Sequence, residues 1–468
     1  MSKAVPMLSA VSIATAARRG ELSVVEHTQA CLERIAQSNP GLNCFTHVVS
    51  ERALKRAHEL DARLARGEDP GTLTGVPFAV KNLFDIEGLS TLAGSFINSS
   101  HPPATRDAVL IQRLEAQGAI LVGALGMGEY AYDFTGENAH YGACRNPWDR
   151  ERMSGGSSSG SGTAVGAALV PLTLGSDTNG SIRVPSSLCG VFGLKPTYGR
   201  LPRTGTFPFS ESLDHVGPLA RSVEDLALAF DHLQGHDAGD LACVSQPWLD
   251  TSSALSQGSE GLRIARAGGF FDCSNFPEAD AAVSKVCEAL GVGHSLSLDG
   301  AAEGRSAAYL ITNAEGAALH RERLLTRLED FDPDTRDRFL AGSLFPATWY
   351  IRAQQVRRRW LEQMLKVFED VDVIIAPCTP CSAPLQGSKT LVLNGVEHPL
   401  RPNLGVFTQP FSAIGLPVCS VPLFLPGAKL PIGVQIVAAP WREDLCLRVA
   451  WQLEHQGIAE CRLPPDCA

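Results

Sequence analysis

Residues 155–199 read GGSSSGSGTAVGAALVPLTLGSDTNGSIRVPSSLCGVFGLKPTYG, and this stretch decides how the rest of the chain is interpreted. It is rich in glycine and serine, and Asp177 is its single acidic residue. Clustered glycines allow tight turns and let backbone N–H groups approach a bound atom. Serines placed among them can supply nucleophilic and proton-relaying hydroxyls. Because this stretch has too few bulky side chains for an ordinary core, we interpret it as a loop region that surrounds a bound group and carries catalytic side chains.

Strands and helices are expected to alternate on both sides of this stretch. Short apolar runs rich in β-branched residues indicate strands, and amphipathic segments indicate helices. The expected strands are 75–88, 119–125, 171–176, 262–267, 371–377, 417–425 and 432–440; the expected helices are 50–66, 107–117, 277–290, 346–369 and 443–457; and a long surface loop is expected at 235–260. This alternation predicts an α/β fold with a large, twisted, mixed β-sheet flanked by helices.

The N-terminal part is expected to be a helical layer. Ser23 can cap a helix that runs through Ile35. The prediction is therefore one domain, 1–468, in which a helical layer (1–70) covers a catalytic α/β core (71–468).

Composition limits the class of protein. With 44% hydrophobic and 19% charged residues, the chain of 468 residues reads as an ordinary globular protein. Its formal net charge of -10 argues against a nucleic-acid partner. The thirteen cysteines are scattered and no secretory signal is recognised, which indicates reduced thiols in a cytoplasmic protein. No apolar run reaches membrane-spanning length, so no membrane partner is expected.

Two further features can take part in chemistry. Lys81, in AVKNLFD, is either an outward lysine on a strand or a partly desolvated base. Ser181 follows the strand at 171–176 and a turn that is either structural or able to direct successive N–H groups at one atom. The second possibility makes Ser181 a nucleophile with an oxyanion hole formed by Thr178, Asn179 and Gly180.

These motifs together resemble the amidase signature family. Lys81, the GGSS that begins at Gly155 and SDTNGSIRVPSSLCGVFGLKPTYGR from Ser176 occur in that family's order, and Ser157 and Ser181 are 24 positions apart. The resemblance implies that Ser181 is the nucleophile, Ser157 the bridging serine after a cis peptide bond, and Lys81 the terminal base. It implies the amidase signature fold and an acyl-enzyme mechanism that needs neither a cofactor nor a metal.

One position departs from the family. Many members have glycine where this chain has Asn179. Asparagine tolerates a positive φ, so the loop is expected to keep its shape.

Within the family, the resemblance is strongest to enzymes that hydrolyse small, anionic, urea-like amides and release ammonia. It implies a homodimer of the large subunit, joined by a small helical accessory subunit. The alternatives are the amidase subunit of a glutamine-dependent aminoacyl-tRNA amidotransferase and a non-catalytic scaffold subunit.

An anionic substrate requires cationic or donor-rich side chains. Arg183, Arg352 and Arg401 are candidates, although Arg183 can instead form a structural ion pair and Arg401 can be a surface charge. Gln409 can present its amide to a urea-like group. The loop YAYDFTGENAH has polar side chains that can either line the pocket or stabilise the loop. They are Tyr132, Asp133, Thr135, Asn138 and His140.

Several other patterns are rejected. Residues 156–160 fit G-x-S-x-G, which would make Ser158 a nucleophile, but no strand precedes them. The same missing strand argues against a dinucleotide loop at 160–162. Cys378 and Cys381 lack a second pair for zinc and are expected to be inert thiols. His232 and His236 lack the context of a metal site, so no metal is predicted.

Overall fold

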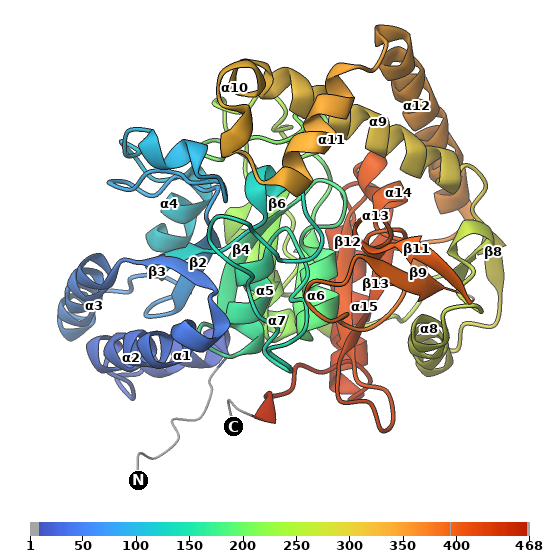
Figure 1. Cartoon of the computed structure of the whole chain (residues 1–468). Coiled ribbons are helices and arrows are strands. Elements are labelled where there is room, and N and C mark those ends of the chain that lie inside the picture. The colour runs from blue at the N-terminus through green and yellow to red at the C-terminus, as the bar shows by residue number, and fades with distance from the viewer. Residues whose placement is uncertain (1–8, 394, 466–468) are drawn as a thin grey trace.

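The computed structural model describes residues 9–393 and 395–465 and has a large mixed sheet at its centre (Figure 1). Eleven strands of these residues pair in the order β1-β3-β2-β4-β6-β5-β12-β13-β9-β7-β8. Their bounds are β1 Phe45–Val48, β2 Pro77–Lys81, β3 Ile120–Leu125, β4 Leu172–Asp177, β5 Phe192–Lys195, β6 His215–Ala220, β7 Ile264–Gly268, β8 Ser295–Ser297, β9 Val373–Pro377, β12 Val418–Leu423 and β13 Ile432–Ala438. Strands β10 (Thr390–Leu393) and β11 (Val396–Pro399) form a separate hairpin.

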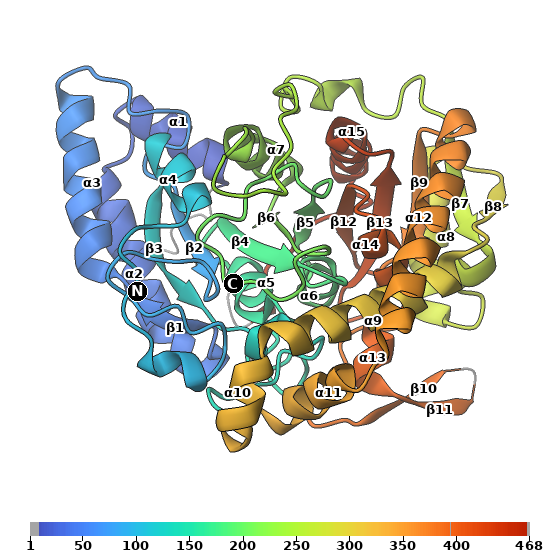
Figure 2. The ribbon, with the colours of Figure 1, turned by 90° about the horizontal axis from the view of Figure 1, so that it is seen from above.

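Helices cover both faces of the sheet (Figure 2). Helices α7 and α15 pack on one face, and α5 and α6 on the other. Helices α9 to α11 lie beyond α5 and α6, and α12 packs on α9 near the end of the sheet that carries β9 and β7. The helices are α1 Ala10–Arg18, α2 Val24–Leu42, α3 Ser50–Ala65, α4 Val109–Ala116, α5 Ser159–Gly166, α6 Arg183–Cys189, α7 Val223–Leu233, α8 Pro277–Leu290, α9 Ala301–Leu319, α10 Arg321–Thr326, α11 Pro333–Ser343, α12 Ala347–Asp370, α13 Leu400–Leu404, α14 Gln409–Ala413 and α15 Glu443–His455.

The predicted α/β class is confirmed, and so are most of its elements. The central strands β4, β12 and β13 are buried along their whole length, as their near-continuous apolar sequence indicates. The Ser23 side chain accepts a hydrogen bond from the N–H of Glu26 and so caps α2, which continues beyond Ile35 to Leu42. No helix in the described chain is long and apolar enough to cross a bilayer.

Two expectations about the fold need correction. The N-terminal layer is not purely helical, because β1 pairs antiparallel with β3 and so joins the sheet. The long segment 235–260 is irregular as expected, but it is not simply a surface loop. The Asp231 carboxylate of α7 accepts hydrogen bonds from the N–H and hydroxyl groups of Thr251 and Ser252, and Thr251 is fully buried. This anchoring depends on tertiary contacts that local sequence patterns do not reveal.

Candidate active site

The sheet brings Lys81 to the glycine- and serine-rich stretch. Strands β2 and β4 are parallel neighbours, so their carboxyl ends, which carry Lys81 and Ser176, lie at the same edge. The Lys81 ammonium donates to Ser157 Oγ at 2.7 Å and to Ser176 Oγ at 2.9 Å. Ser157 follows the expected cis peptide bond from Gly156. The N–H of the next residue donates to the Ser181 carbonyl at 3.2 Å, which joins the two serine segments.

Burial suits Lys81 to act as a base. Its side chain is fully buried, and desolvation lowers its pKa to about 7, opposed chiefly by the Asp177 carboxylate. Since an ordinary lysine titrates near pH 10.5, this environment makes the neutral amine available near neutral pH.

The loop 178–181 is held in place from several sides. Thr178 Oγ1 donates to Asp214 at 2.6 Å, and Thr408 Oγ1 donates to the Asn179 carbonyl at 2.7 Å. Because a peptide's C=O and N–H point in opposite directions, the Gly180 N–H points away from Thr408. Gly180 has a φ of +140°, and a Cβ there would collide with Thr408 Oγ1. The loop therefore requires glycine at this position.

The expected role of Asn179 in the loop is wrong in one respect. Among the described non-glycine residues with positive φ, Asn179 is absent, so the unusual backbone angle belongs to Gly180 instead. The Asn179 side chain Nδ2 donates to Thr312 Oγ1 at 2.8 Å on α9. Asparagine is thus accommodated through a side-chain contact and not through its tolerance of left-handed backbone.

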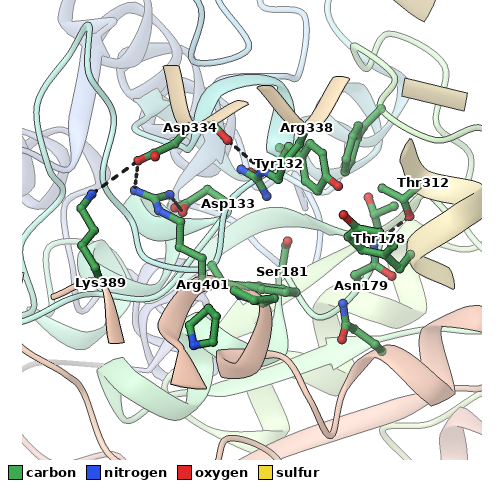
Figure 3. Close-up of a pocket in the computed structure, with 17 residues that line it drawn as sticks. Tyr132, Asp133, Thr178, Asn179, Ser181, Thr312, Asp334, Arg338, Lys389 and Arg401 are labelled. Atoms are coloured by element: carbon green, nitrogen blue, oxygen red, sulfur yellow. Dashed lines mark hydrogen bonds and ion pairs between the residues drawn. The ribbon is translucent and has the colours of Figure 1, made fainter. Parts of the chain in front are cut away.

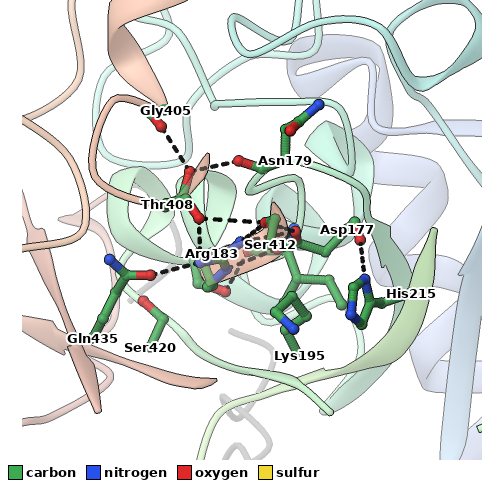
Figure 4. Close-up of polar contacts among 12 residues, drawn as sticks. Asp177, Asn179, Arg183, Lys195, His215, Gly405, Thr408, Ser412, Ser420 and Gln435 are labelled. Carbon is green, nitrogen blue, oxygen red and sulfur yellow. Dashed lines mark hydrogen bonds and ion pairs between the residues drawn. The ribbon is translucent and has the colours of Figure 1, made fainter. Parts of the chain in front are cut away.

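Arg183 does not reach the cavity that contains Ser181. It forms a fully buried, two-pronged ion pair with Asp177, with both N–O distances at 2.9 Å (Figure 4). Its Nη1 also donates to the Thr408 carbonyl at 3.0 Å and to Gln435 Oε1 at 2.7 Å. Burial alone would raise the pKa of the Asp177 carboxyl, but the Arg183 guanidinium holds this pKa well below its usual range. Of the two alternatives for Arg183, these contacts favour the structural ion pair.

Ser181 lines a cavity of about 340 Å³ (Figure 3). Lys81 and Ser157 are not among its lining residues and are fully buried. The cavity is enclosed by side chains from loop 131–134, loop 178–181, the segment before β6, α9, α11, the β10–β11 hairpin, α13 and α14. They are Ala131, Tyr132, Asp133, Phe134, Thr178, Asn179, Ser181, Phe209, Tyr309, Thr312, Asp334, Arg338, Lys389, Pro399, Arg401, Pro402 and Gln409.

Four of the predicted substrate-binding residues therefore border the cavity with Ser181: Tyr132, Asp133, Arg401 and Gln409. Gln409 Oε1 accepts a hydrogen bond from Arg305 Nε at 2.8 Å, which leaves the Gln409 Nε2 as the donor for a ligand. Arg352 lies elsewhere, exposed on α12, where it contacts Gln355 at 3.4 Å.

The remaining polar residues of the 132–140 loop chiefly stabilise it. Thr135 donates its N–H and hydroxyl to Asp133 Oδ1 at 2.9 and 2.8 Å. Asn138 donates to the carbonyls of Gly94 and Met127 at 2.7 and 3.0 Å. His140 Nε2 lies 3.4 Å from a Glu129 carboxylate oxygen. For Thr135, Asn138 and His140 the loop-stabilising alternative fits the contacts.

The cavity also contains residues that the sequence did not single out. Asp334 and Arg338 belong to α11, Thr312 to α9, and Lys389 precedes β10. None of these residues lies in a motif, and only the packing of segments that are distant in the sequence brings them to Ser181.

The rejected motifs have structural explanations. Ser158 Oγ donates to the Ser176 carbonyl at 3.0 Å, and no strand directly precedes it. Burial raises the pKa of Cys378 and Cys381 to about 12, which keeps both thiols protonated and unreactive. His232 Nε2 contacts Thr72 Oγ1 at 2.5 Å, and His236 Nδ1 contacts the Cys243 carbonyl at 3.1 Å.

Comparison with known proteins establishes the class. The family described as Amidase matches residues 26–447, so the chain belongs to the amidase family and is a hydrolase of carbon–nitrogen amide bonds. AtzE, the 1-carboxybiuret hydrolase subunit of Pseudomonas sp. (strain ADP), is 50% identical, over 97% of this chain and 100% of that protein. A glutamyl-tRNA(Gln) amidotransferase subunit of Geobacter metallireducens is 36% identical, over 94% of this chain and 97% of that protein.

A solved structure supports the same relationship. It is described as a vestigial protein complex that reveals the evolutionary origins of an s-triazine catabolic enzyme. It matches with a TM-score of 0.96 at 49% identity, over 97% of this chain and 100% of that chain. The resemblance to amidase signature enzymes drawn from the sequence motifs is thereby confirmed.

Proposed function

We propose that this protein hydrolyses a small, anionic, urea-like amide of the 1-carboxybiuret or biuret type and releases ammonia, in the degradation of cyanuric acid and related s-triazines. The observation that carries the proposal is the contact of Lys81 Nζ with Ser157 Oγ at 2.7 Å, next to a loop that presents Ser181 to a cavity of about 340 Å³. A cavity of this size suits a small substrate. The relative that is half identical supplies the substrate class, and the similar solved structure is described in terms of s-triazine catabolism.

In the proposed reaction, neutral Lys81 draws a proton from Ser157, and Ser157 draws the proton of Ser181. The Ser181 Oγ attacks the amide carbonyl, and N–H groups of Thr178, Asn179 and Gly180 stabilise the oxyanion. The relay returns a proton to the leaving nitrogen as the C–N bond breaks, which releases ammonia and leaves an acyl-enzyme. Water then attacks the ester, and Ser181 recovers its proton.

The assembly and location are also proposals. We infer a single cytoplasmic domain, 1–468, that forms a homodimer and binds a small helical accessory subunit. The description of the similar solved structure as a vestigial complex supports a partner protein. The scaffold alternative is disfavoured by the buried Lys81–Ser157 contact, which a protein without catalysis has no need to keep.

Ammonia release from a panel of substrates tests the proposal. Biuret and 1-carboxybiuret are expected to be hydrolysed at least about tenfold more efficiently than glutamine, since a pocket built for one small amide leaves polar groups unpaired with another. Each assay is run with and without the small accessory subunit. Hydrolysis of glutamine alone, or only in the presence of aminoacyl-tRNA, would favour the amidotransferase alternative.

The pH dependence of kcat/KM tests the base. Protonated Lys81 cannot accept a proton, and its pKa of about 7 lies well below that of free lysine. The rate is therefore expected to rise about tenfold per pH unit below pH 7 and to level off above it. A rate that stays constant from pH 5 to pH 9 would contradict the assignment of Lys81.

A further inference from the structure

Several polar groups that border the cavity are already paired within the chain. The Arg401 guanidinium contacts three carboxylates, with Asp133 at 2.6 Å, Asp334 at 2.8 Å and Glu137 at 3.0 Å. An anion that approached Arg401 would have to compete with these three acids. Gln409 differs, because the nitrogen of its carboxamide has no hydrogen-bond partner in residues 9–393 and 395–465.

The orientation of this carboxamide is fixed by Arg305 on α9. Arg305 Nε donates to Gln409 Oε1 at 2.8 Å, and its Nη2 donates to the Pro402 carbonyl at 2.8 Å and to Asn403 Oδ1 at 3.2 Å. A guanidinium has donors and no acceptor, so the carboxamide must turn its oxygen toward Arg305 and its nitrogen away. Gln409 is only 6% exposed and borders the cavity. Its Nε2 group therefore remains as a donor for a ligand there.

A second glutamine shows how such a buried amide is satisfied when it is purely structural. Gln435 Oε1 likewise accepts from a buried arginine, Arg183 Nη1, at 2.7 Å (Figure 4). Its Nε2, however, donates to the carbonyls of Pro377 at 2.7 Å and Phe407 at 3.0 Å. Native proteins leave few buried donors unpaired, because each one costs free energy. The open nitrogen of Gln409 therefore indicates a ligand that supplies an oxygen.

The position of Gln409 is linked to the loop that carries the nucleophile. The preceding residue, Thr408, donates its hydroxyl to the Asn179 carbonyl at 2.7 Å. Helix α14, which begins at Gln409, is thus attached to loop 178–181. Gln409 and Ser181 border the same cavity of about 340 Å³, so one small molecule can contact both side chains.

We propose that Gln409 Nε2 donates to the second carbonyl of a biuret-type substrate, and that Arg305 is the positioning residue that keeps this donor toward the cavity. The inference rests on the proposed function, because it assumes that the reacting amide lies at Ser181. Biuret and 1-carboxybiuret have a second carbonyl beyond the nitrogen that follows the reacting one, whereas an alkylurea has none. A fixed donor discriminates against a molecule that lacks the matching acceptor, since the donor then stays unpaired.

The test compares acetylurea with ethylurea, which has a methylene group where acetylurea has its second carbonyl. Binding is measured in a Ser181→Ala background, which is expected to hydrolyse neither ligand, by NMR titrations that detect millimolar Kd values. This background protein is expected to bind acetylurea about tenfold more tightly than ethylurea. Adding Gln409→Glu keeps the shape of the side chain, but a carboxylate that pairs with Arg305 presents no N–H. The preference is then expected to fall below about twofold.

Variants of Arg305 test its positioning role. Arg305→Met removes the donor that fixes Gln409, so either end of the amide can face the cavity, and the preference for acetylurea is expected to fall at least about threefold. Arg305→Lys can still donate to the amide oxygen and is expected to recover part of the preference. An arginine with a merely structural role would weaken the binding of both ligands alike.

The chain offers a matched control for the glutamine variant. Gln355 Oε1 accepts from Arg352 at 3.4 Å in an exposed arginine–glutamine pair on α12, and neither residue lines the cavity with Ser181. Gln355→Glu is therefore expected to leave the preference for acetylurea unchanged.

Equal binding of the two ligands by the background protein, a preference that survives Gln409→Glu, or its loss in Gln355→Glu would overturn the role of Gln409. An unchanged preference in Arg305→Met would overturn the positioning role. Ethylurea binding within about threefold of the background shows that a variant is folded, and Gln409→Met replaces Gln409→Glu if that variant is not. Ammonia release from biuret is measured separately with Ser181 intact. Its absence would contradict the proposed function, while the titrations still decide the role of Gln409.

Discussion

Ser181→Ala is expected to abolish ammonia release, lowering kcat by at least about four orders of magnitude. The change removes the one atom that forms the acyl-enzyme and leaves the oxyanion loop and the cavity in place. The Ser181 carbonyl, which accepts from the N–H of Ser158 at 3.2 Å, is retained, so the fold is expected to persist. Steady-state rates measure the loss of ammonia release, circular dichroism tests whether the fold persists, and fluorophosphonate labelling tests whether the reactive hydroxyl is gone.

Ser161→Ala is the matched control for this variant. Ser161 comes from the same glycine- and serine-rich stretch and is equally buried, but its hydroxyl donates to the Leu174 carbonyl at 3.1 Å. Its loss is expected to cost about 1 kcal/mol of stability with little change in rate. If Ser181→Ala stayed active while Ser161→Ala did not, the nucleophile would have been assigned to the wrong serine.

Lys81→Met is expected to reduce kcat by about a thousandfold or more. Methionine fills much of the volume of lysine but cannot accept the proton that Ser157 passes on. Because the amine is fully buried, its removal also ends a desolvation cost, so the free energy of unfolding is expected not to fall. Kinetics and urea denaturation measure the two effects.

The variant should also lose the pH dependence that Lys81 creates. Lys285→Met, on α8, removes one partly buried lysine far from the motif and serves as the control. Its activity is expected to equal that of the wild type. A Lys81→Met protein that kept both its rate and the rise near pH 7 would show that another group is the base.

The sequence predicted the parts of the site that depend on local pattern and motif order. A strand that carries Lys81 and a turn before Ser181 are recognisable because β-branched runs and glycine clusters have direct backbone consequences. The end of that strand was not predicted, since β2 stops at Lys81 and the expected strand extended to residue 88. The contact between Lys81 and Ser157 followed from the resemblance to a family, since the two residues are 76 positions apart.

The sequence could not predict contacts that arise from packing between distant elements. For Arg183 the sequence left open a substrate contact and a structural ion pair. The ion-pair alternative fits the contacts, but Thr408 and Gln435 reach Arg183 only once α14 and β13 are assembled. Arg338 had no motif at all, and its exposure to the cavity depends on Asp334 turning toward Arg401. Side-chain orientation within a helix is decided by such competition and not by spacing alone.

The hydrogen bond from Thr408 to the Asn179 carbonyl has a consequence for synthesis of the protein. All three proposed reacting residues lie before residue 200. Two residues near the other end of the chain nevertheless stabilise the site, because Thr408 binds the Asn179 carbonyl of loop 178–181 and Gln435 binds the buried Arg183. A ribosome-bound nascent chain in which all three of these residues have been synthesised still lacks α14 and β13, which carry or adjoin Thr408 and Gln435. We therefore expect hydrolytic activity only after these late residues have been synthesised, and we expect an amino-terminal fragment that ends before Thr408 to be inactive.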